Sequence, residues 1–397
     1  ADGARGMLAT IAGSMMTVAA LTFSLTLSTL AQVSNQYTSR VLRTFMRNRT
    51  NQLVLGFFVS IFVYCLVVLR TIRGGDEGRF IPSVAVTAGL ALALVSIGVL
   101  VFFIHHIASS LQAANIVAGV AEETEAAIER LFPGKLGVGA DEEERGDLSD
   151  RADGLTWVPV PASRTGYVQD IDGKGLLTLA RRLQAVVRME RGIGSFVTRG
   201  SPLVSVARYE GEPLRVDRSL VDDLNEPFSL GRQRTTEQDV GFGLRQIVDI
   251  ALKAQSKGVN DVTTAVICID HLGALLAVLA SCDLADPLRS DDERVRVVAV
   301  RPSFASFVAT ALDQVRVAAD GDVALYLRLL TALATVASRT GRPARVAVLH
   351  QQVRLIAEAA ARTLATDHER ARVRSRVEQV ERQMSPRASP PARPPAG

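Results

Sequence analysis

The sequence is poor in the residues that build disulfide frameworks and metal centres. It has three cysteines, Cys65, Cys268 and Cys282, and they form neither a CxxC pair nor a cluster with histidine. This pattern excludes a disulfide-stabilised fold and a zinc centre as the organising feature of the chain. We therefore expect buried, reduced cysteines, and we predict no metal site and no cofactor.

Lysine is also scarce, and arginine supplies almost all of the positive charge. The four lysines are Lys135, Lys174, Lys253 and Lys257, and the net charge of +4 is small for 397 residues. We attribute the excess of arginine to a GC-rich coding sequence. We predict no nucleic-acid partner.

Charge itself is missing from three long stretches within the first 105 residues. Residues 6–39, 50–69 and 80–104 contain no Asp, Glu, Lys or Arg. At a rise of ~1.5 Å per residue, each stretch is long enough to cross a hydrocarbon layer of ~30 Å as a helix. The rest of the chain is charged, as in a soluble domain. The sequence therefore predicts an α-helical membrane protein with three spans, a lipid-bilayer environment and a large soluble domain.

The distribution of arginine and the character of the soluble domain predict the orientation. The loop between the first two spans carries four arginines and no acid, whereas the loop between the second and third carries three arginines and two acids. The positive-inside rule places the first loop in the cytoplasm. The C-terminal domain has no disulfide pattern, so we also place it in the cytoplasm, and we place the spans in the inner (plasma) membrane. Because the chain starts Ala-Asp-Gly without a basic region, we expect it to lack its natural N-terminus.

The first span is rich in small and hydroxyl side chains. Gly13, Thr17, Ala20, Ser24 and Ser28 follow one another at spacings of four, three, four and four, which places them on one helix face. Small residues allow close helix packing in lipid, within or between subunits, and hydroxyls can also line a hydrated pore. Both interpretations stay open, and the candidates for either role are Thr17, Ser24, Ser28 and Asn35.

The spans contain no Asp, Glu, Lys, Arg or His side chain, which argues against a proton-coupled transporter but not against a channel. After the third span the helical pattern continues to residue 131, so residues 1–132 are predicted to form the spans and a cytoplasmic stalk. An acidic linker follows at 133–154.

The remaining chain is predicted to be an α+β soluble domain in two parts. Residues 155–216 form a small β-rich module, with strands at 156–160, 167–169 and 186–189 and a helix at 174–183. A turn at 194–204 resembles the hairpins of barrel-sandwich folds, so we expect a barrel-like module. Residues 217–384 are predicted to be helical, with helices at 262–280 and near 303–318, 321–340 and 342–383, and one strand at 295–300. Residues 385–397, rich in Pro and Arg, are predicted to be disordered.

A dense group of charged and amide residues lies at 234–261. Cap residues at 235–238 precede an apolar helical run, and Asn260 or Asp261 caps the next helix. The polar members are Arg234, Gln238, Asp239, Arg245, Gln246, Asp249, Asn260 and Asp261.

These residues, with Phe242-Gly243, Ser256 and Asp270, resemble the signature of the DUF2254 family of predicted bacterial membrane proteins. Phe23-Ser24-Leu25 and Ile104-His105-His106-Ile107 also fit that family. The resemblance runs from about residue 7 to 350, and Lys257 and Val262 stand where the family often has proline. It implies membrane location and this architecture, and no established activity.

Three interpretations of the polar group follow. It is a structural network of caps and Arg–Asp pairs, a pocket for a ligand or effector, or an acid/base site. No nucleophile–histidine pair accompanies it, so we predict no catalytic residue and no enzyme.

Our first functional hypothesis is a homo-oligomeric channel or transport-like protein for ions, with a cytoplasmic regulatory domain. The alternative is a membrane-anchored sensor or scaffold that responds to a small effector, and a membrane enzyme comes last. A channel requires Thr17, Ser24 and Ser28 to face a shared axis. An enzyme requires Arg245, Asp249 and Asp261 to converge on a ligand.

Overall fold

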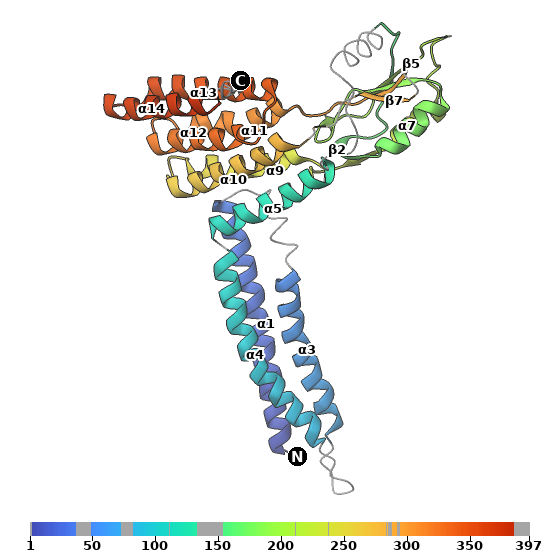
Figure 1. The fold of residues 1–397 in the computed structure, drawn as a ribbon. Helices are drawn as coiled ribbons and strands as arrows, with labels where there is room; N and C mark the ends of the chain where they lie inside the picture. Colours follow the sequence, from blue (N-terminus) through green and yellow to red (C-terminus); the bar gives the residue numbers. More distant parts are fainter. Residues whose placement is uncertain are drawn as a thin grey trace, which may run out of the picture. The chain divides into compact units, whose positions relative to one another are not determined.

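The computed structural model describes residues 2–36, 49–72, 82–110, 112–132, 154–210, 212–236, 238–282, 284, 288–291 and 294–384. Almost all of the predicted acidic linker and the whole predicted C-terminal tail lie outside the described residues. The chain divides into two compact units, Ala1–Ile116 and Val117–Gly397. Figure 1 shows the elements of both units in sequence colours. We call them unit 1 and unit 2 and describe each by itself.

Unit 1 is built from three long apolar helices that run side by side (Figure 1). They are α1 (Asp2–Gln36), α3 (Arg49–Thr71) and α4 (Ser83–Ser110). Each is long and apolar enough to cross a membrane, as their lack of internal charge predicts. Leu8, Phe58 and Phe103 are completely buried where the helices meet. The Tyr64 hydroxyl of α3 donates to the Ala85 carbonyl oxygen of α4 at 2.9 Å.

The predicted unbroken helix from the third span to residue 131 is wrong, because two helices occupy this stretch. Helix α4 ends at Ser110 and α5 runs over Ala113–Leu131. The Asn115 side-chain amide donates to the Ser109 carbonyl oxygen at 2.7 Å, and a side chain that bonds a neighbouring carbonyl competes with the helical pattern. Helix α5 buries one face, consisting of Val117, Val120, Ala121, Thr124, Ala127 and Ile128.

A fourth helix, α10 (Val262–Ser281), also meets the length and apolarity needed for a membrane span. It packs in unit 2 against α9 (Val240–Ala254) and α12 (Val323–Ala337). A helix that is apolar on all sides suits burial within protein, and Cys268, Ile269, Leu272 and Leu276 are completely buried.

The strands of unit 2 form two open sheets. The larger has the order β1-β5-β3-β8-β7 and the smaller has the order β4-β2-β6. All pairs are antiparallel except β3 with β8. The strands are β1 (Val158–Pro161), β2 (Gly166–Ile171), β3 (Val186–Met189), β4 (Phe196–Val197), β5 (Pro202–Ala207), β6 (Phe228–Gly231), β7 (Leu288–Asp291) and β8 (Arg294–Val298).

The expected barrel-like arrangement is therefore wrong for the residues that the structure describes. The turn between β4 and β5 exists, with Gly200 in the left-handed region at φ +86°. However, β4 pairs with β2, whereas β5 pairs with β1 and β3. The turn thus carries the chain from one sheet to the other and does not close a hairpin.

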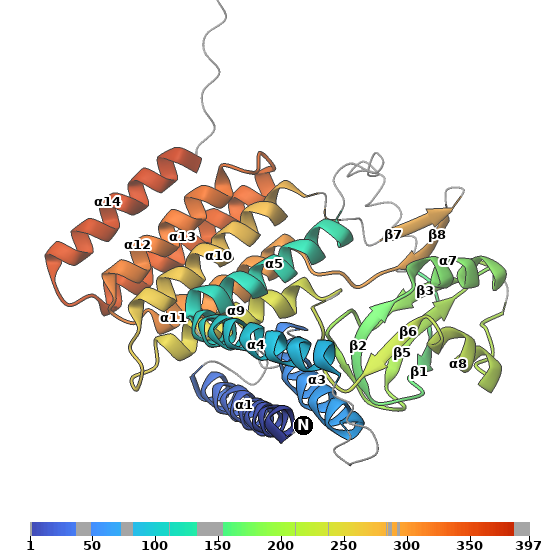
Figure 2. The ribbon, with the colours of Figure 1, turned by 90° about the horizontal axis from the view of Figure 1, so that it is seen from below.

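The larger sheet is completed by a strand from far along the chain. Val297 of β8 lies opposite Val187 of β3 in the parallel pair, and β6 and β7 also come from beyond residue 216. Helices α7 (Gly173–Arg182) and α8 (Arg218–Asn225) lie beside the strands (Figure 2). They contribute Leu176 and Leu224 to the core that they share with the strands.

The predicted helix at 342–383 is two helices, α13 (Pro343–Thr363) and α14 (Asp367–Met384), which follow α11 (Phe304–Ala318) and α12. The Glu369 N–H donates to Thr366 Oγ1 at 3.3 Å, and the Thr366 N–H donates to Glu369 Oε2 at 3.2 Å. This reciprocal capping box starts a new helix.

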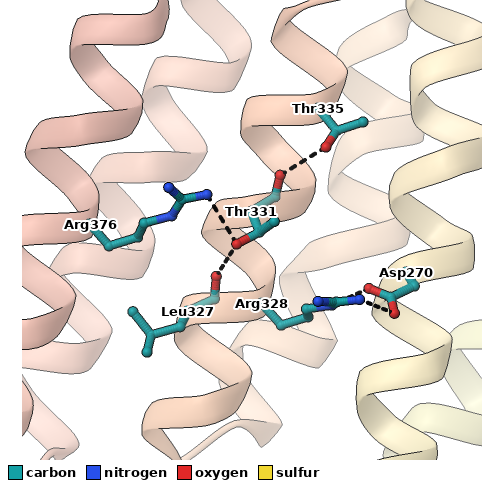
Figure 3. A network of polar contacts seen from close by, with 6 residues as sticks. All are labelled: Asp270, Leu327, Arg328, Thr331, Thr335 and Arg376. Carbon is teal, nitrogen blue, oxygen red and sulfur yellow. Dashed lines mark hydrogen bonds and ion pairs between the residues drawn. The ribbon is translucent and has the colours of Figure 1, made fainter.

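Polar contacts join three of these helices (Figure 3). Arg328 of α12 forms a bidentate ion pair with Asp270 of α10, and Arg376 of α14 donates to Thr331 Oγ1 at 3.2 Å. Side-chain contacts therefore connect α12 both to α10 and to α14.

Candidate functional site

The polar group at 234–261 starts with an ion pair at the first turn of α9. Arg234 Nε donates to Asp239 Oδ2 at 2.8 Å, and Arg234 Nη2 donates to Asp239 Oδ1 at 2.9 Å. Asp239 Oδ1 also accepts the Phe242 N–H at 2.9 Å. Asp239 is therefore the N-cap, and the prediction that the cap lies within 235–238 is wrong. Thr236 instead hydrogen-bonds Glu123 of α5.

Gly194, which follows β3, lies against this ion pair. Its φ is +80°, and a Cβ there would stand 2.4 Å from Asp239 Oδ2 and 2.9 Å from Arg234 Nη2. The position therefore needs glycine for two reasons, backbone conformation and close approach. The fold thus joins the glycine turn and the polar group, which the sequence presents as separate features.

The middle of α9 carries a second pair and a buried amide. Arg245 Nε lies 2.9 Å from Asp249 Oδ1, one helical turn away. Gln246 is buried, and its Oε1 has no hydrogen-bond partner among the described residues. These three residues all lie on the helix itself, and the Arg245–Asp249 pair joins two of them within α9.

The connection from α9 to α10 holds the last members. Asn260 is left-handed at φ +49°, a conformation that asparagine adopts more readily than most residues. Asp261 caps α10 by accepting the Thr264 N–H at 3.0 Å and the Thr264 hydroxyl at 2.5 Å. These hydrogen bonds to the carboxylate lower the pKa of Asp261. Of the two residues predicted to cap this helix, Asn260 and Asp261, the cap is Asp261.

The polar group is thus spread along α9, whose length is about 22 Å. Each charged member has a partner within five residues: Arg234 with Asp239, Arg245 with Asp249, and Asp261 with Thr264. The convergence of Arg245, Asp249 and Asp261 that an enzyme would require is absent from these contacts. Gln238 differs from the charged members, because it lines two cavities.

The larger cavity, of about 660 Å³, lies at the start of α9 and α7. Its walls are mainly apolar and come from several elements, with Asp170, Lys174, Gln238 and Asp239 among the polar residues. The apolar walls include Phe132, Leu177, Met189, Val240, Val297 and Phe307. A volume of this size suits a drug-sized ligand.

The second cavity, of about 440 Å³, adjoins the first through Asp170 and Gln238, which line both. Its other walls are Arg130, Gln169, Ser229 and Thr235. The sequence pattern pointed to Gln238 and Asp239 as members of the polar group, but to none of the other residues that line the two cavities. They come from segments far apart in the chain, and no local pattern marks them.

The small-residue stripe of α1 lies on its exposed side. Gly13, Thr17, Ala20, Ser24 and Ser28 are all exposed, and Thr17 Oγ1 donates to the Gly13 carbonyl oxygen at 3.0 Å. The face of α1 that packs within unit 1 is a different one, consisting of Leu8, Ala12, Met15 and Ala19. The side chain of Asn35 lies outside the described residues.

Within the described ranges, the structure brings together no group of three or more His, Cys, Asp or Glu side chains that could hold a metal ion.

Comparison with known proteins confirms the family resemblance. The family described as "Predicted membrane protein (DUF2254)" matches residues 1–335. The chain is 35% identical over 372 residues to an uncharacterised protein of Mycobacterium tuberculosis, and equally to one of Mycobacterium bovis. The match covers 93% of this chain and 70% of each relative. No solved structure matches the chain significantly.

Proposed function

This chain belongs to the DUF2254 family of predicted membrane proteins, and we propose that it is a homo-oligomeric, channel-like protein of the inner (plasma) membrane. Its C-terminal unit would lie in the cytoplasm and regulate it. The observation that carries this proposal is the exposure of the α1 stripe, because the described residues of unit 1 leave the small face of this helix uncovered.

The chemistry of the stripe favours contact with another helix over contact with lipid. From Gly13 to Ser28 it extends about 22 Å, most of the thickness of a hydrocarbon layer of ~30 Å. Small side chains let backbones approach closely, and hydroxyls can bond across a helix pair. A second copy of α1 presents the same surface, as a symmetric assembly needs. Large apolar side chains are also exposed in unit 1, on α4 at Leu94, Val95, Ile97 and Val101 and on α1 at Met16, Leu21, Phe23 and Leu27.

The conduction hypothesis adds that hydroxyls of several copies face a hydrated axis. Ion pathways are built from polar groups and hydrophobic constrictions and need no charged residue in the span. The test is ion flux into liposomes that contain the full-length protein, measured beside a Ser24→Leu/Ser28→Leu variant. A matched control is Ser60→Leu/Thr87→Leu, which replaces two exposed hydroxyls of α3 and α4.

We expect the stripe variant to abolish flux while its oligomer and fold persist, and the control to conduct like the wild type. Absence of flux over a range of ions, voltages and pH values would reject conduction. Equal loss of flux in the control would reject a specific role of the stripe.

A second candidate is a membrane-anchored sensor or scaffold without conduction, which the cavity in unit 2 favours. Its ligand-sized volume and its mixed apolar and polar walls support this second proposal. We propose no catalysis, because the charged residues of the polar group have structural partners close by.

A further inference from the structure

The two adjoining cavities of unit 2 differ in the chemistry of their walls. The larger, of about 660 Å³, is walled mainly by apolar side chains. The described residues that line the smaller, of about 440 Å³, are all polar. Asp170 and Gln238 line both, so the two cavities lie next to each other at these residues. One molecule with an apolar part and a polar part would match both sets of walls.

The apolar walls include side chains that pack against the hydrophobic core and are themselves partly exposed. Ile171, Leu177, Ile193 and Ala299 pack against the core of the sheets and are only partly buried themselves. The rings of Phe132 and Phe307 meet edge to face, with their centroids 6.4 Å apart. A ligand with an apolar body removes this concave surface from water, which is favourable in proportion to the area covered.

The polar walls favour a head group without net charge. Among the residues that the structure describes, the lining of the smaller cavity holds one acid, Asp170, and one base, Arg130, beside the hydroxyl-bearing residues Ser229 and Thr235. Gln169 Nε2 donates to the Gln233 carbonyl oxygen at 2.5 Å, which leaves its amide oxygen to accept. Hydroxyl groups suit such a surface because they both donate and accept hydrogen bonds.

The start of α7 disfavours an anion in the larger cavity. Helix N-termini usually attract anions through their free N–H groups. Here the Asp172 carboxylate already accepts the N–H groups of Lys174 and Gly175, at 3.1 and 3.0 Å. At the start of α9 the Asp239 carboxylate occupies the equivalent position.

We propose that unit 2 binds an amphipathic small molecule, with its apolar body in the larger cavity and an uncharged, hydroxyl-bearing head in the smaller one. This binding role goes beyond channel assembly and is independent of conduction, because it depends on unit 2 alone.

The test uses three probes that share an octyl chain and differ in the head group. Octyl glucoside carries a neutral polyol, octanoate an anion and octylammonium a cation. Each is titrated by calorimetry, below its micelle concentration, into the full chain in lipid nanodiscs, and the signal of protein-free nanodiscs is subtracted. We expect saturable binding of octyl glucoside and about tenfold or greater weakening with either charged head, since an anion would be repelled by Asp170 and a cation by Arg130 in the smaller cavity.

Two variants examine the two cavities. Ala299→Phe fills the larger one, and Thr235→Val removes a hydroxyl from the smaller one at nearly constant volume. We expect each to weaken octyl glucoside binding, by about tenfold or more and by about three- to tenfold respectively, because the first excludes the body and the second removes a hydrogen bond. The matched controls, Ala334→Phe and Thr335→Val on α12, should leave binding unchanged.

Absence of saturable binding would overturn the proposal. Equal binding of all three heads, or binding that neither cavity variant weakens, would show adsorption to lipid or surface and overturn it too. Tightest binding of octanoate would reject the neutral head. If Ala299→Phe fails to fold, Thr235→Val decides alone. Because the readout is binding and not flux, this result and the channel test fail independently.

Discussion

Arg345 Nη1 donates to the carbonyl oxygen of Ala280 at 2.7 Å, so a side chain of α13 closes the end of α10. The same guanidinium also donates to the carbonyl oxygens of Leu279 at 3.3 Å and Cys282 at 3.0 Å. Arg345 is only 7% exposed. The last carbonyl oxygens of a helix have no hydrogen-bond donors within that helix. At the end of α10, the buried guanidinium of Arg345 donates these hydrogen bonds.

Replacement of this arginine should therefore destabilise unit 2. We expect Arg345→Met to lower the free energy of unfolding by about 2–4 kcal/mol, because buried carbonyls would lose charged donors. Urea unfolding of the full chain in micelles, followed by circular dichroism, measures the change. Arg339→Met, at an exposed arginine after α12, is the control and should change little. Equal effects of the two would contradict a specific role of Arg345.

The Arg234–Asp239 pair gives a second prediction. Asp239→Ala removes a helix cap and leaves Arg234 unpaired beside Gly194, so we expect a loss of about 2–4 kcal/mol in unfolding free energy. The control is Asp367→Ala, at the start of α14, where the aspartate also pairs with an arginine but its side chain is 99% exposed. That change should cost less than about 1 kcal/mol. A small effect of Asp239→Ala would show that the pair contributes little to stability.

Helix α5 approaches α9 closely at Gly243, which gives a third prediction. A Cβ at 243 would stand 2.1 Å from Thr124 Oγ1 and 2.8 Å from Thr124 Cγ2. We expect Gly243→Ala to destabilise unit 2 by about 1–3 kcal/mol through overpacking. Adding Thr124→Ala should restore part of the loss, since it removes both atoms. Additive losses in the double variant would exclude this contact as the cause.

Gly119 in α5 is the matched control for Gly243, because a Cβ there would meet no atom within 4 Å. Gly119→Ala should stabilise the helix by up to about 1 kcal/mol, as alanine is the better helix former. Thermal unfolding of the two alanine variants should therefore shift in opposite directions.

The Asp261 cap predicts a dependence of stability on acid pH. Hydrogen bonds from Thr264 lower the pKa of this carboxyl in the folded chain. A carboxyl with a lowered pKa contributes stability above its unfolded pKa of about 3.9, and the contribution is lost as pH falls through the folded value. Asp261→Asn should therefore flatten the fall in stability below about pH 5. Identical pH profiles of variant and wild type, from urea unfolding at pH 3 to 7, would contradict this.

Local patterns in the sequence predict several elements well. The three spans of unit 1 follow from the absence of charge over stretches longer than a bilayer requires, which is a property of consecutive residues. Strand β3 and the cap at Asp261 follow from short patterns for the same reason. The missed break between α13 and α14 also had a local signal, the capping box at Thr366 and Glu369.

Other features depend on residues that the sequence keeps far apart. The parallel pairing of Val187 with Val297 crosses the whole α9–α10 segment. Gly194 meets Asp239 only because both segments pack at the start of α9. The cavity walls come from strands and helices between residues 131 and 307. Such contacts depend on which elements pack together, and hydrophobic periodicity does not encode that choice.

The sequence by itself thus determined the division into apolar spans and a charged domain, the family, and the residue types at 234–261. Only the tertiary structure decided that the α1 stripe lies on the uncovered face, that the strands form two open sheets, and that Gln238 stands between an apolar and a polar cavity. The physical reason is that burial along one helix or strand is periodic and readable locally. Which surface covers which is fixed by packing between distant segments.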